Sequence, residues 1–141
     1  MTIDDLRLGL RLTRQAGWNQ TESDWLRFIN LEPSVCFVAE LDGRPVETTT
    51  PCVFGGEAWV AMVLVDVNAR GRGVGTELVR HSVNYLEQRE VRTVHLDATY
   101  LGQGIYGKLA FKLEYELTWF EGVAPRGIWG TRRAGAWTWI I

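Results

Sequence analysis

Side chains that bind metals are scarce in this sequence. Its 141 residues include 2 cysteines and 2 histidines. Cys36 and Cys52 do not form a Cys-x-x-Cys pair, and His81 and His95 cannot complete a tetrahedral ligand set by themselves. The sequence therefore predicts no metal site and two reduced, half-buried thiols.

Long hydrophobic runs and excess positive charge are also lacking. The longest uninterrupted apolar run, residues 58–65, is too short to cross a bilayer. The opening residues, MTIDDL, are acidic and contain no apolar signal region. The formal net charge is -2, so long-range attraction to nucleic acid is not expected. These absences favour a soluble, cytoplasmic protein with no nucleic-acid or membrane partner.

Hydrophobic residues make up 46% of the chain, enough for the core of one domain over residues 1–141. Apolar residues at helical spacing predict a first helix over about residues 3–16, capped by Thr2 and Asp5. A second helix follows Thr21 and ends before Pro33.

The hydrophobic period then changes to two. This pattern predicts strands at 35–41 and about 46–54, joined by a hairpin turn at 42–43. A second turn at 55–56 leads into residues 58–66, which are continuously apolar and therefore predict a central, buried strand.

The remaining elements follow a glycine-rich loop. We expect a helix from this loop to about residue 89, a strand at 91–98 reached by a crossover, a short helix at 103–110 and a strand at 113–121. The core face of the long helix is predicted to comprise Val74, Leu78, Val79, Val83 and Leu86. An antiparallel meander followed by one βαβ unit indicates an α/β fold with a mixed sheet.

The glycine-rich loop, NARGRGVGTELV, stands between a strand and a helix and so predicts an anion site. The first amides of a helix lack internal partners, and glycines let an oxygen approach them. A nucleoside triphosphate is disfavoured because no lysine stands where the phosphate-loop motif requires it. A dinucleotide is disfavoured because Thr76 replaces the third glycine of its motif. The pyrophosphate of coenzyme A remains.

Two motifs resemble the GNAT superfamily of N-acetyltransferases. Arg70-x-x-Gly73-x-Gly75 matches the family's [QR]xxGx[GA] pyrophosphate motif, and residues 105–111, IYGKLAF, resemble its LYxKxGF. The resemblance covers about residues 4–121, and the opening residues look closest to an uncharacterised bacterial subgroup. It implies a mixed, mostly antiparallel sheet, flanked by helices and splayed where the cofactor binds.

The resemblance also implies site residues. The pantetheine arm would lie along the backbone of Val63 and Val65, with an amide near Val65 as oxyanion donor. Thr99 would contact the cofactor, and Tyr106 would protonate the departing thiolate. The pyrophosphate would bind the backbone amides of Arg70, Gly71, Arg72, Gly73, Val74, Gly75 and Thr76.

The general base remains open on sequence grounds. Glu47, Glu57 and Asp97 fall on or beside strands that could face the cleft. His81 is expected on the solvated side of its helix, and His95 is expected to be half-buried rather than a base.

The sequence departs from the family pattern at four points. Val67 replaces a common proline, which should loosen the turn, and Ala110 replaces a glycine, where its methyl group should crowd the cofactor or tilt the following phenylalanine. Thr99 replaces an asparagine, and the glycines around it predict a late helix start. The family's first strand is missing, and residues 122–141 match no family element. We expect this tryptophan-rich segment to be buried, by completing the sheet or by pairing in a homodimer, or to close the acceptor site.

These features predict transfer of an acetyl group from acetyl-CoA to a primary amine, with a small-molecule acceptor. Neither cysteine lies on a cofactor motif, which favours direct attack in a ternary complex over an acyl-enzyme. Two alternatives stay open: a non-catalytic acyl-CoA-binding module and a transferase for a different acyl group.

Overall fold

A computed structural model describes residues 1–118 and shows a mixed α/β fold built on a four-stranded open sheet. The sheet has the order β1-β2-β3-β4; β1, β2 and β3 run antiparallel, and β4 is parallel to β3. The elements are α1 (Leu6–Ala16), α2 (Glu22–Leu31), β1 (Phe37–Leu41), β2 (Arg44–Phe54), β3 (Glu57–Val65), α3 (Val74–Gln88), β4 (Thr93–Leu96) and α4 (Tyr100–Lys108).

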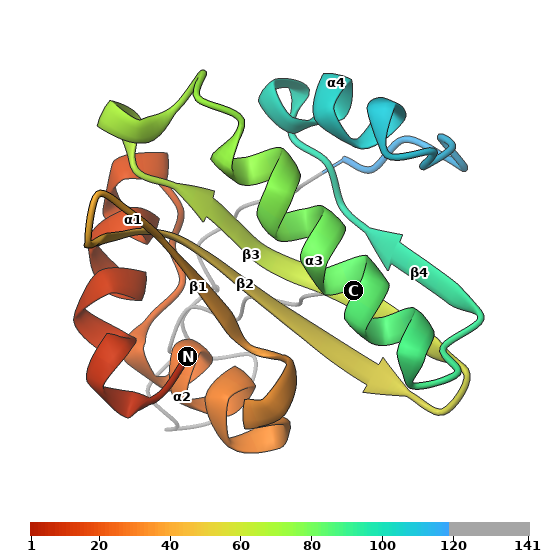
Figure 1. The fold of residues 1–141 in the computed structure, drawn as a ribbon, viewed down its shortest axis with the longest axis horizontal. Coiled ribbons are helices and arrows are strands. Elements are labelled where there is room, and N and C mark those ends of the chain that lie inside the picture. Colours follow the sequence, from red (N-terminus) through yellow and green to blue (C-terminus); the bar gives the residue numbers. More distant parts are fainter. Residues whose placement is uncertain (119–141) are drawn as a thin grey trace, which may run out of the picture.

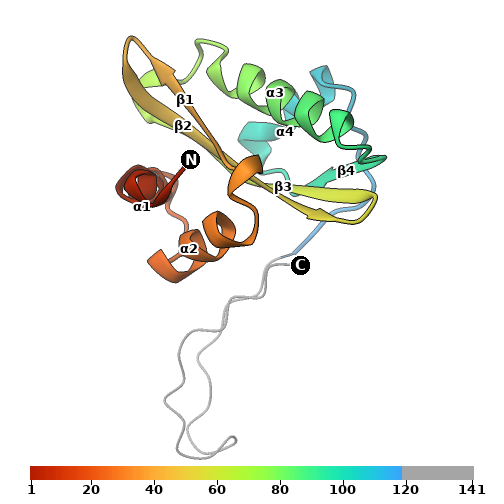
Figure 2. The ribbon, with the colours of Figure 1, turned by 60° about the horizontal axis from the view of Figure 1, so that its bottom comes forward.

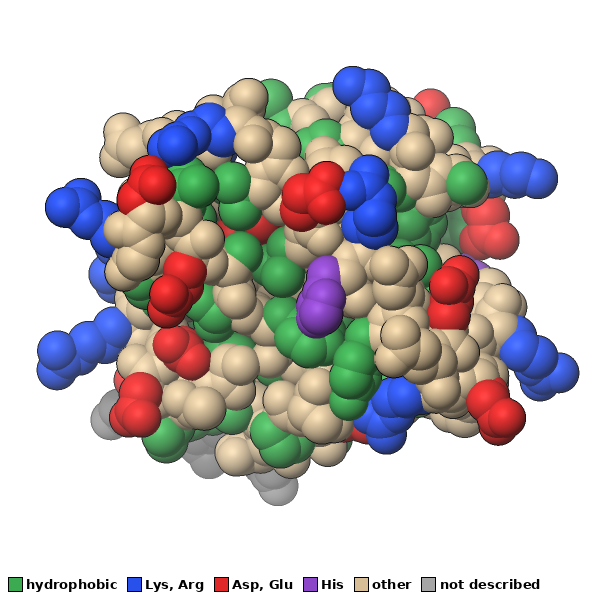
Figure 3. Space-filling view, in the orientation of Figure 1, with side chains coloured by type: hydrophobic (Ala, Val, Ile, Leu, Met, Phe, Trp, Pro, Cys, Tyr) green, Lys and Arg blue, Asp and Glu red, His purple; other side chains and the backbone are tan. Residues whose placement is uncertain are grey.

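Helices cover both faces of the sheet. Helices α1 and α2 lie against one face, and α3 crosses the other face with α4 beside it (Figures 1 and 2). The outer surface around α3 carries interspersed charges of both signs with hydrophobic side chains between them (Figure 3). Within residues 1–118, no helix is long and apolar enough to cross a membrane.

Local capping sets the boundaries of the first two helices as predicted. Thr2 and Asp5 form the capping box of a 3₁₀ turn that leads into α1, and Gly17 ends α1 with a φ of 70°. The Thr21 amide and hydroxyl both donate to the Asp24 carboxylate at the start of α2. These contacts explain why local sequence was sufficient to place both helices.

Close packing joins α1 to α2. A Cβ at Gly9 would lie 2.7 Å from the indole of Trp25, which is completely buried. The Trp25 indole N–H donates to the Thr13 hydroxyl at 3.0 Å, so the only polar atom of that side chain is satisfied. Gly9 is therefore required for the approach of Trp25.

A β-bulge in the centre of β3 shapes the sheet. Thr48 pairs with Leu64 and Thr50 pairs with Ala61, so β3 has one extra residue between these pairs, and Met62 has a φ of 50°. The bulge reverses the alternation of side chains along β3. Before it, Ala58 and Val60 pack in the cluster beneath α3; after it, Met62 and Leu64 pack with α1 and α2.

The two parallel strands separate beyond this point. Strand β4 pairs with Glu57–Val60 only, so residues 61–65 of β3 have no strand neighbour on that side within the described chain. The predicted central position of this strand and the predicted splayed, mostly antiparallel sheet are confirmed.

Four predicted elements differ from the structure. The strand expected at 91–98 spans only Thr93–Leu96, in β4. The strand expected at 35–41 begins at Phe37, because Pro33–Val35 forms a 3₁₀ turn. The expected late start of the short helix is wrong: α4 begins at Tyr100, and its glycines Gly102 and Gly104 keep negative φ values.

The strand expected at 113–121 is absent over residues 113–118, which have no ladder partner. Residues 119–121 lie outside the described part of the chain, as does the segment 122–141 for which burial, a homodimer contact or closure of the acceptor site was predicted.

Candidate functional site

The glycines before α3 have two different structural roles. Gly71 and Gly73 have φ values of 75° and 81°, in the left-handed region that other residues adopt only with strain. Gly75 has no such conformation. A Cβ there would lie 3.2 Å from Val65 Cγ2 and 3.4 Å from Glu47 Oε1, so Gly75 permits α3 to approach the sheet closely.

The first turn of α3 offers unpaired amides. Gly73 is the N-cap residue without a side-chain cap, and the first bond of the helix runs from the Glu77 amide to the Gly73 carbonyl. The amides of Val74, Gly75 and Thr76 therefore lack intrahelical acceptors. Together with the helix dipole they form an anion-binding terminus of a long helix.

Both arginines of the loop are held at its sides. Arg70 Nε donates to the Val65 carbonyl at 3.3 Å, and Arg72 forms an ion pair with Asp42 of the β1–β2 turn at 3.5 Å. The side chain of Arg72 is half exposed. A bound phosphate can draw Arg72 away from Asp42 at little cost in free energy, because such exposed ion pairs contribute little stability.

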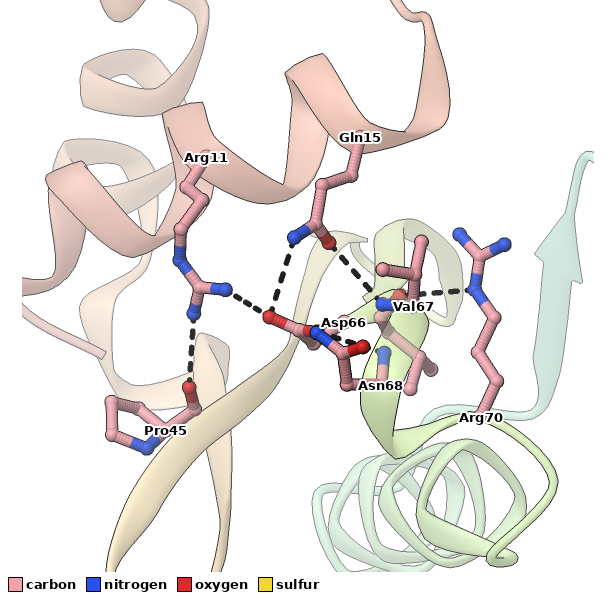
Figure 4. A network of polar contacts seen from close by, with 8 residues as sticks. Arg11, Gln15, Pro45, Asp66, Val67, Asn68 and Arg70 are labelled. Atoms are coloured by element: carbon pink, nitrogen blue, oxygen red, sulfur yellow. Dashed lines mark hydrogen bonds and ion pairs between the residues drawn. The ribbon is translucent and has the colours of Figure 1, made fainter.

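A polar network centred on Asp66 anchors this loop, and the sequence analysis missed it (Figure 4). Asp66 is 6% exposed, accepts from the Asn68 amide at 3.0 Å and pairs with Arg11 from α1. The side-chain amide of Gln15 donates to the Asp66 carboxylate at 3.4 Å and accepts from the Val67 backbone amide at 3.3 Å. These hydrogen bonds lower the pKa of Asp66, and the bond from the Asn68 amide has the largest effect.

Val67 does not loosen the turn, contrary to expectation. Its amide donates to the Gln15 side chain at 3.3 Å, a bond that the family's proline could not make. The contact joins two residues that are 52 positions apart in sequence, so only the folded chain reveals it.

A small cavity of about 50 Å³ lies where β3 and β4 separate. Its lining residues are Trp18, Val60, Ala61, Met62, Val63, Asp97, Thr99 and Tyr106. The structure thus brings together four predicted or candidate site residues, Val63, Thr99, Asp97 and Tyr106. The loop residues and Val65 lie toward the start of α3 instead.

Tyr106 is held firmly in this cavity wall. Its ring lies against Gly102, where an added Cβ would be 2.7 Å away, and it meets Phe111 edge to face with centroids 6.0 Å apart. Burial, and secondly the charge of Glu47, raises the pKa of Tyr106 to about 12. The hydroxyl is therefore protonated at neutral pH.

Thr99 and Ala110 mark the two ends of α4. Thr99 is the N-cap residue, and its side chain makes no capping hydrogen bond to the helix. At the other end Ala110 has a φ of 65°, and the Phe111 amide bonds to the Tyr106 carbonyl as in a Schellman motif. The methyl group of Ala110 is exposed, so its effect is backbone strain.

The three candidate bases have different environments. Glu47 is 0% exposed, and neither of its carboxyl oxygens has a hydrogen-bond partner within residues 1–118. Burial raises its pKa to about 8. Glu57 is 66% exposed and lies outside the cavity, with His95 Nε2 3.9 Å from its carboxylate. Asp97 borders the cavity, and burial raises its pKa.

The histidines and cysteines lie outside the cavity. His95 is half-buried and stacks on Trp59, as predicted, and His81 is exposed on α3. Burial raises the pKa of Cys36 to about 11 and also raises that of Cys52. Thiols with raised pKa values are poor nucleophiles. Among the described residues, no three His, Cys, Asp or Glu side chains form a cluster able to hold a metal.

A second, open hollow of about 370 Å³ lies between β1 and α3. Glu40, Arg72, Glu77 and His81 contribute its polar side chains. It is separate from the cavity between β3 and β4 and contains none of the candidate bases.

Similar proteins have been described. An N-alpha-acetyltransferase MAK3 of Arabidopsis thaliana is 32% identical over 92 residues, which are 60% of this chain. The chain spans 48% of the length of that plant relative. The bacterial subgroup expected from the opening residues stays a prediction.

Solved structures share the fold. Ard1 from Thermoplasma volcanium superimposes with a TM-score of 0.75 at 18% identity, over 82% of this chain and 81% of that one. A predicted acetyltransferase from Clostridium acetobutylicum, solved with acetyl-CoA, gives a TM-score of 0.66 at 17% identity, over 85% and 92% of the two chains. The sequence model of the acetyltransferase (GNAT) family matches residues 5–111. The chain belongs to the GNAT acetyltransferase family.

Proposed function

We propose that this protein transfers an acetyl group from acetyl-CoA to a primary amine, with a small-molecule acceptor. One observation carries the proposal: β3 separates from β4 directly beside the uncapped first turn of α3. An anion site and an adjoining gap in the sheet suit a cofactor with a pyrophosphate at one end and an extended arm at the other. Family membership supports the same reading.

Cofactor binding uses the loop and the free edge of β3. The pyrophosphate binds the amides from Arg70 to Thr76, with Arg72 released from Asp42 to contact it. The pantetheine arm lies along residues 61–65 of β3, whose backbone groups at Val63 and Val65 can pair with it as a strand would. An amide of this edge stabilises the oxyanion of the thioester.

Transfer is direct. The lone pair of the amine attacks the thioester carbonyl carbon, the resulting tetrahedral intermediate expels the thiolate, and the C–N bond replaces the C–S bond. Tyr106 donates a hydrogen bond to the departing thiolate, and the amine loses a proton to a base. No covalent enzyme intermediate is involved, since Cys36 is buried, Cys52 is half-buried and both thiols have raised pKa values.

Tyr106 acts mainly by donating a hydrogen bond. With a pKa of about 12 the tyrosine is a weaker acid than a thiol, whose ordinary pKa is about 8.5. The near balance expected from ordinary pKa values therefore does not hold. A hydrogen bond to sulfur stabilises developing thiolate charge while the proton remains mostly on Tyr106.

Asp97 is the best-placed base. It borders the same cavity as Tyr106, directly after the end of β4, and remains accessible from solvent. Its raised pKa makes it a better proton acceptor than an ordinary aspartate. Glu57 lies outside the cavity, and Glu47 is sealed from any acceptor.

A thiol-release assay tests the function. Purified protein and acetyl-CoA are mixed with small primary amines and, separately, with short peptides bearing a free N-terminus. We expect amine-dependent release of coenzyme A, lowered at least tenfold by Asp97→Asn and unchanged by the exposed control Glu57→Gln. Saturable binding without release from any amine supports a non-catalytic module instead, and release only from longer acyl-CoA substrates supports a different acyl group.

A further inference from the structure

Glu47 is a buried carboxyl that has no hydrogen-bond partner within residues 1–118 and that the transfer reaction above does not use. It lies on β2 opposite Val65, where the glycine loop leaves the sheet. Its side chain points toward α3, because Oε1 is 3.4 Å from the position that a Cβ of Gly75 would occupy. The carboxyl therefore lies directly beneath the amides assigned to the pyrophosphate.

The surroundings of Glu47 are dry and offer no partner. The side chain is 0% exposed, and neither oxygen is hydrogen bonded within residues 1–118. An ionised carboxylate in such a place would carry an uncompensated charge. The neutral acid is therefore the favoured form, and burial raises the pKa of Glu47 to about 8.

Charged groups on the neighbouring elements are occupied elsewhere. Arg70 donates to the Val65 carbonyl, and Arg72 pairs with Asp42 of the β1–β2 turn. On α3, Glu77 pairs with Arg80, and beyond β3, Asp66 pairs with Arg11 from the opposite face of the sheet. On β1, Ala39 opposes Glu47, and the adjoining Glu40 is exposed.

Tyr106 on α4 is the titratable group that responds to Glu47. The charge of Glu47 contributes to the raised pKa of Tyr106. Glu47 is thus within electrostatic reach of both halves of the site: the phosphate-binding turn of α3 and the tyrosine at the sulfur.

We infer that Glu47 is a positioning residue of the cofactor site that must be neutral for acetyl-CoA to bind tightly. The inference rests on the proposed function, because it assumes that the pyrophosphate occupies the first turn of α3. With no ligand, the positive end of α3 eases ionisation of Glu47. A bound pyrophosphate cancels that potential and repels the carboxylate, so cofactor binding favours the protonated acid.

The inference predicts the direction in which acetyl-CoA affinity changes with pH. Because the complex holds the proton of Glu47 more tightly than the free protein does, affinity is full below a pH of about 8 and falls above it. The fall approaches tenfold per pH unit until the pKa of Glu47 in the complex is reached. Phosphate groups themselves titrate near pH 6, so they do not contribute in this range.

Calorimetric titration with acetyl-CoA from about pH 7 to about pH 9.5 tests the inference. The wild-type dissociation constant should rise about tenfold or more across this range, whereas that of Glu47→Gln should change less than about twofold. Glu47→Leu, a second neutral variant, guards against a folding defect in the first. Glu77→Gln, which removes an exposed carboxylate from the same helix, should keep the wild-type pH dependence.

Failure of this inference can be distinguished from failure of the proposed function. An equal rise in wild type and in both neutral variants overturns the role of Glu47 but leaves the proposed function intact. Absence of acetyl-CoA binding by the wild type at every pH overturns the proposed function and this inference with it.

Discussion

Two buried carboxylic acids at the same end of the sheet have opposite surroundings. Asp66 faces α1 and is satisfied by a backbone amide, an arginine and a glutamine, and the first of these bonds lowers its pKa most. Glu47 faces α3 without a hydrogen-bond partner within residues 1–118, and its pKa is raised to about 8. The hydrogen bonds of Asp66 hold the glycine loop in place. Glu47 has no partner that fixes its charge, so its protonation can respond to a ligand bound at the loop.

The two faces of the sheet differ in the same way, in whether their polar groups have hydrogen-bond partners. Beneath α1 and α2, a glycine admits Trp25, whose indole N–H is satisfied by Thr13. Beneath α3, a glycine brings uncapped amides close to the sheet and leaves them unpaired. Satisfied polar groups stabilise a fold, whereas unsatisfied ones at a cleft are available for binding.

The largest effect that separates the two faces is expected from Gly73→Glu. The variant forces a non-glycine residue to a φ of 81° and places a negative charge where the pyrophosphate binds. Acetyl-CoA affinity should fall more than about 100-fold by calorimetry. Gly17→Ala is the matched control, because Gly17 has a φ of 70° at the end of α1; it should lower stability but keep affinity.

Tyr106→Phe should have the next largest effect, on turnover rather than on binding. Loss of the hydrogen bond to the thiolate should lower kcat about 10- to 100-fold, with the dissociation constant of acetyl-CoA changed less than about threefold. Steady-state kinetics and calorimetry on the same preparation separate the two quantities. An unchanged kcat would assign Tyr106 to packing against Phe111 alone.

Asp66→Asn tests the hydrogen-bonded one of the two buried acids. Removing the charge that Arg11 and the Asn68 amide stabilise should lower the free energy of unfolding by about 1 to 2 kcal/mol at neutral pH. Because the folded-state pKa is lowered, this contribution is present above the ordinary pKa of aspartate and is lost as the pH falls below it. Denaturation by urea at neutral and acidic pH should show the gap between variant and wild type closing in acid.

The smallest effect concerns strain at the end of α4. Ala110→Gly relieves a φ of 65° in an exposed residue and should raise the free energy of unfolding by about 1 kcal/mol or less. Thermal unfolding measures the gain. A loss of stability would show that the entropy of the unfolded chain outweighs the strain.

Local signals in the sequence were sufficient for most of the fold. The capping box at Thr2, the stop at Gly17 and the turns at 42–43 and 55–56 depend on neighbouring residues, and all lie where predicted. The glycine loop was also visible, because backbone conformation demands glycine at specific positions.

Tertiary contacts account for what the sequence did not reveal. The network around Asp66 joins α1 to the end of β3 across more than 50 residues, and no local pattern marks it. The burial of Glu47 involves its pairing with Val65 of β3 and the close approach of Gly75 of α3, which no local pattern shows. The strand expected from residue 113 onward has alternating apolar residues, yet over 113–118 it has no ladder partner.

The central claim is that the uncapped first turn of α3 and the gap beside β3 hold acetyl-CoA. Calorimetric titration of acetyl-CoA into the wild type and Gly73→Glu at neutral pH tests it most directly. We predict saturable binding of one acetyl-CoA per chain by the wild type and none by the variant. Equal affinities in the two proteins, or no binding by the wild type, would contradict the assignment of the site.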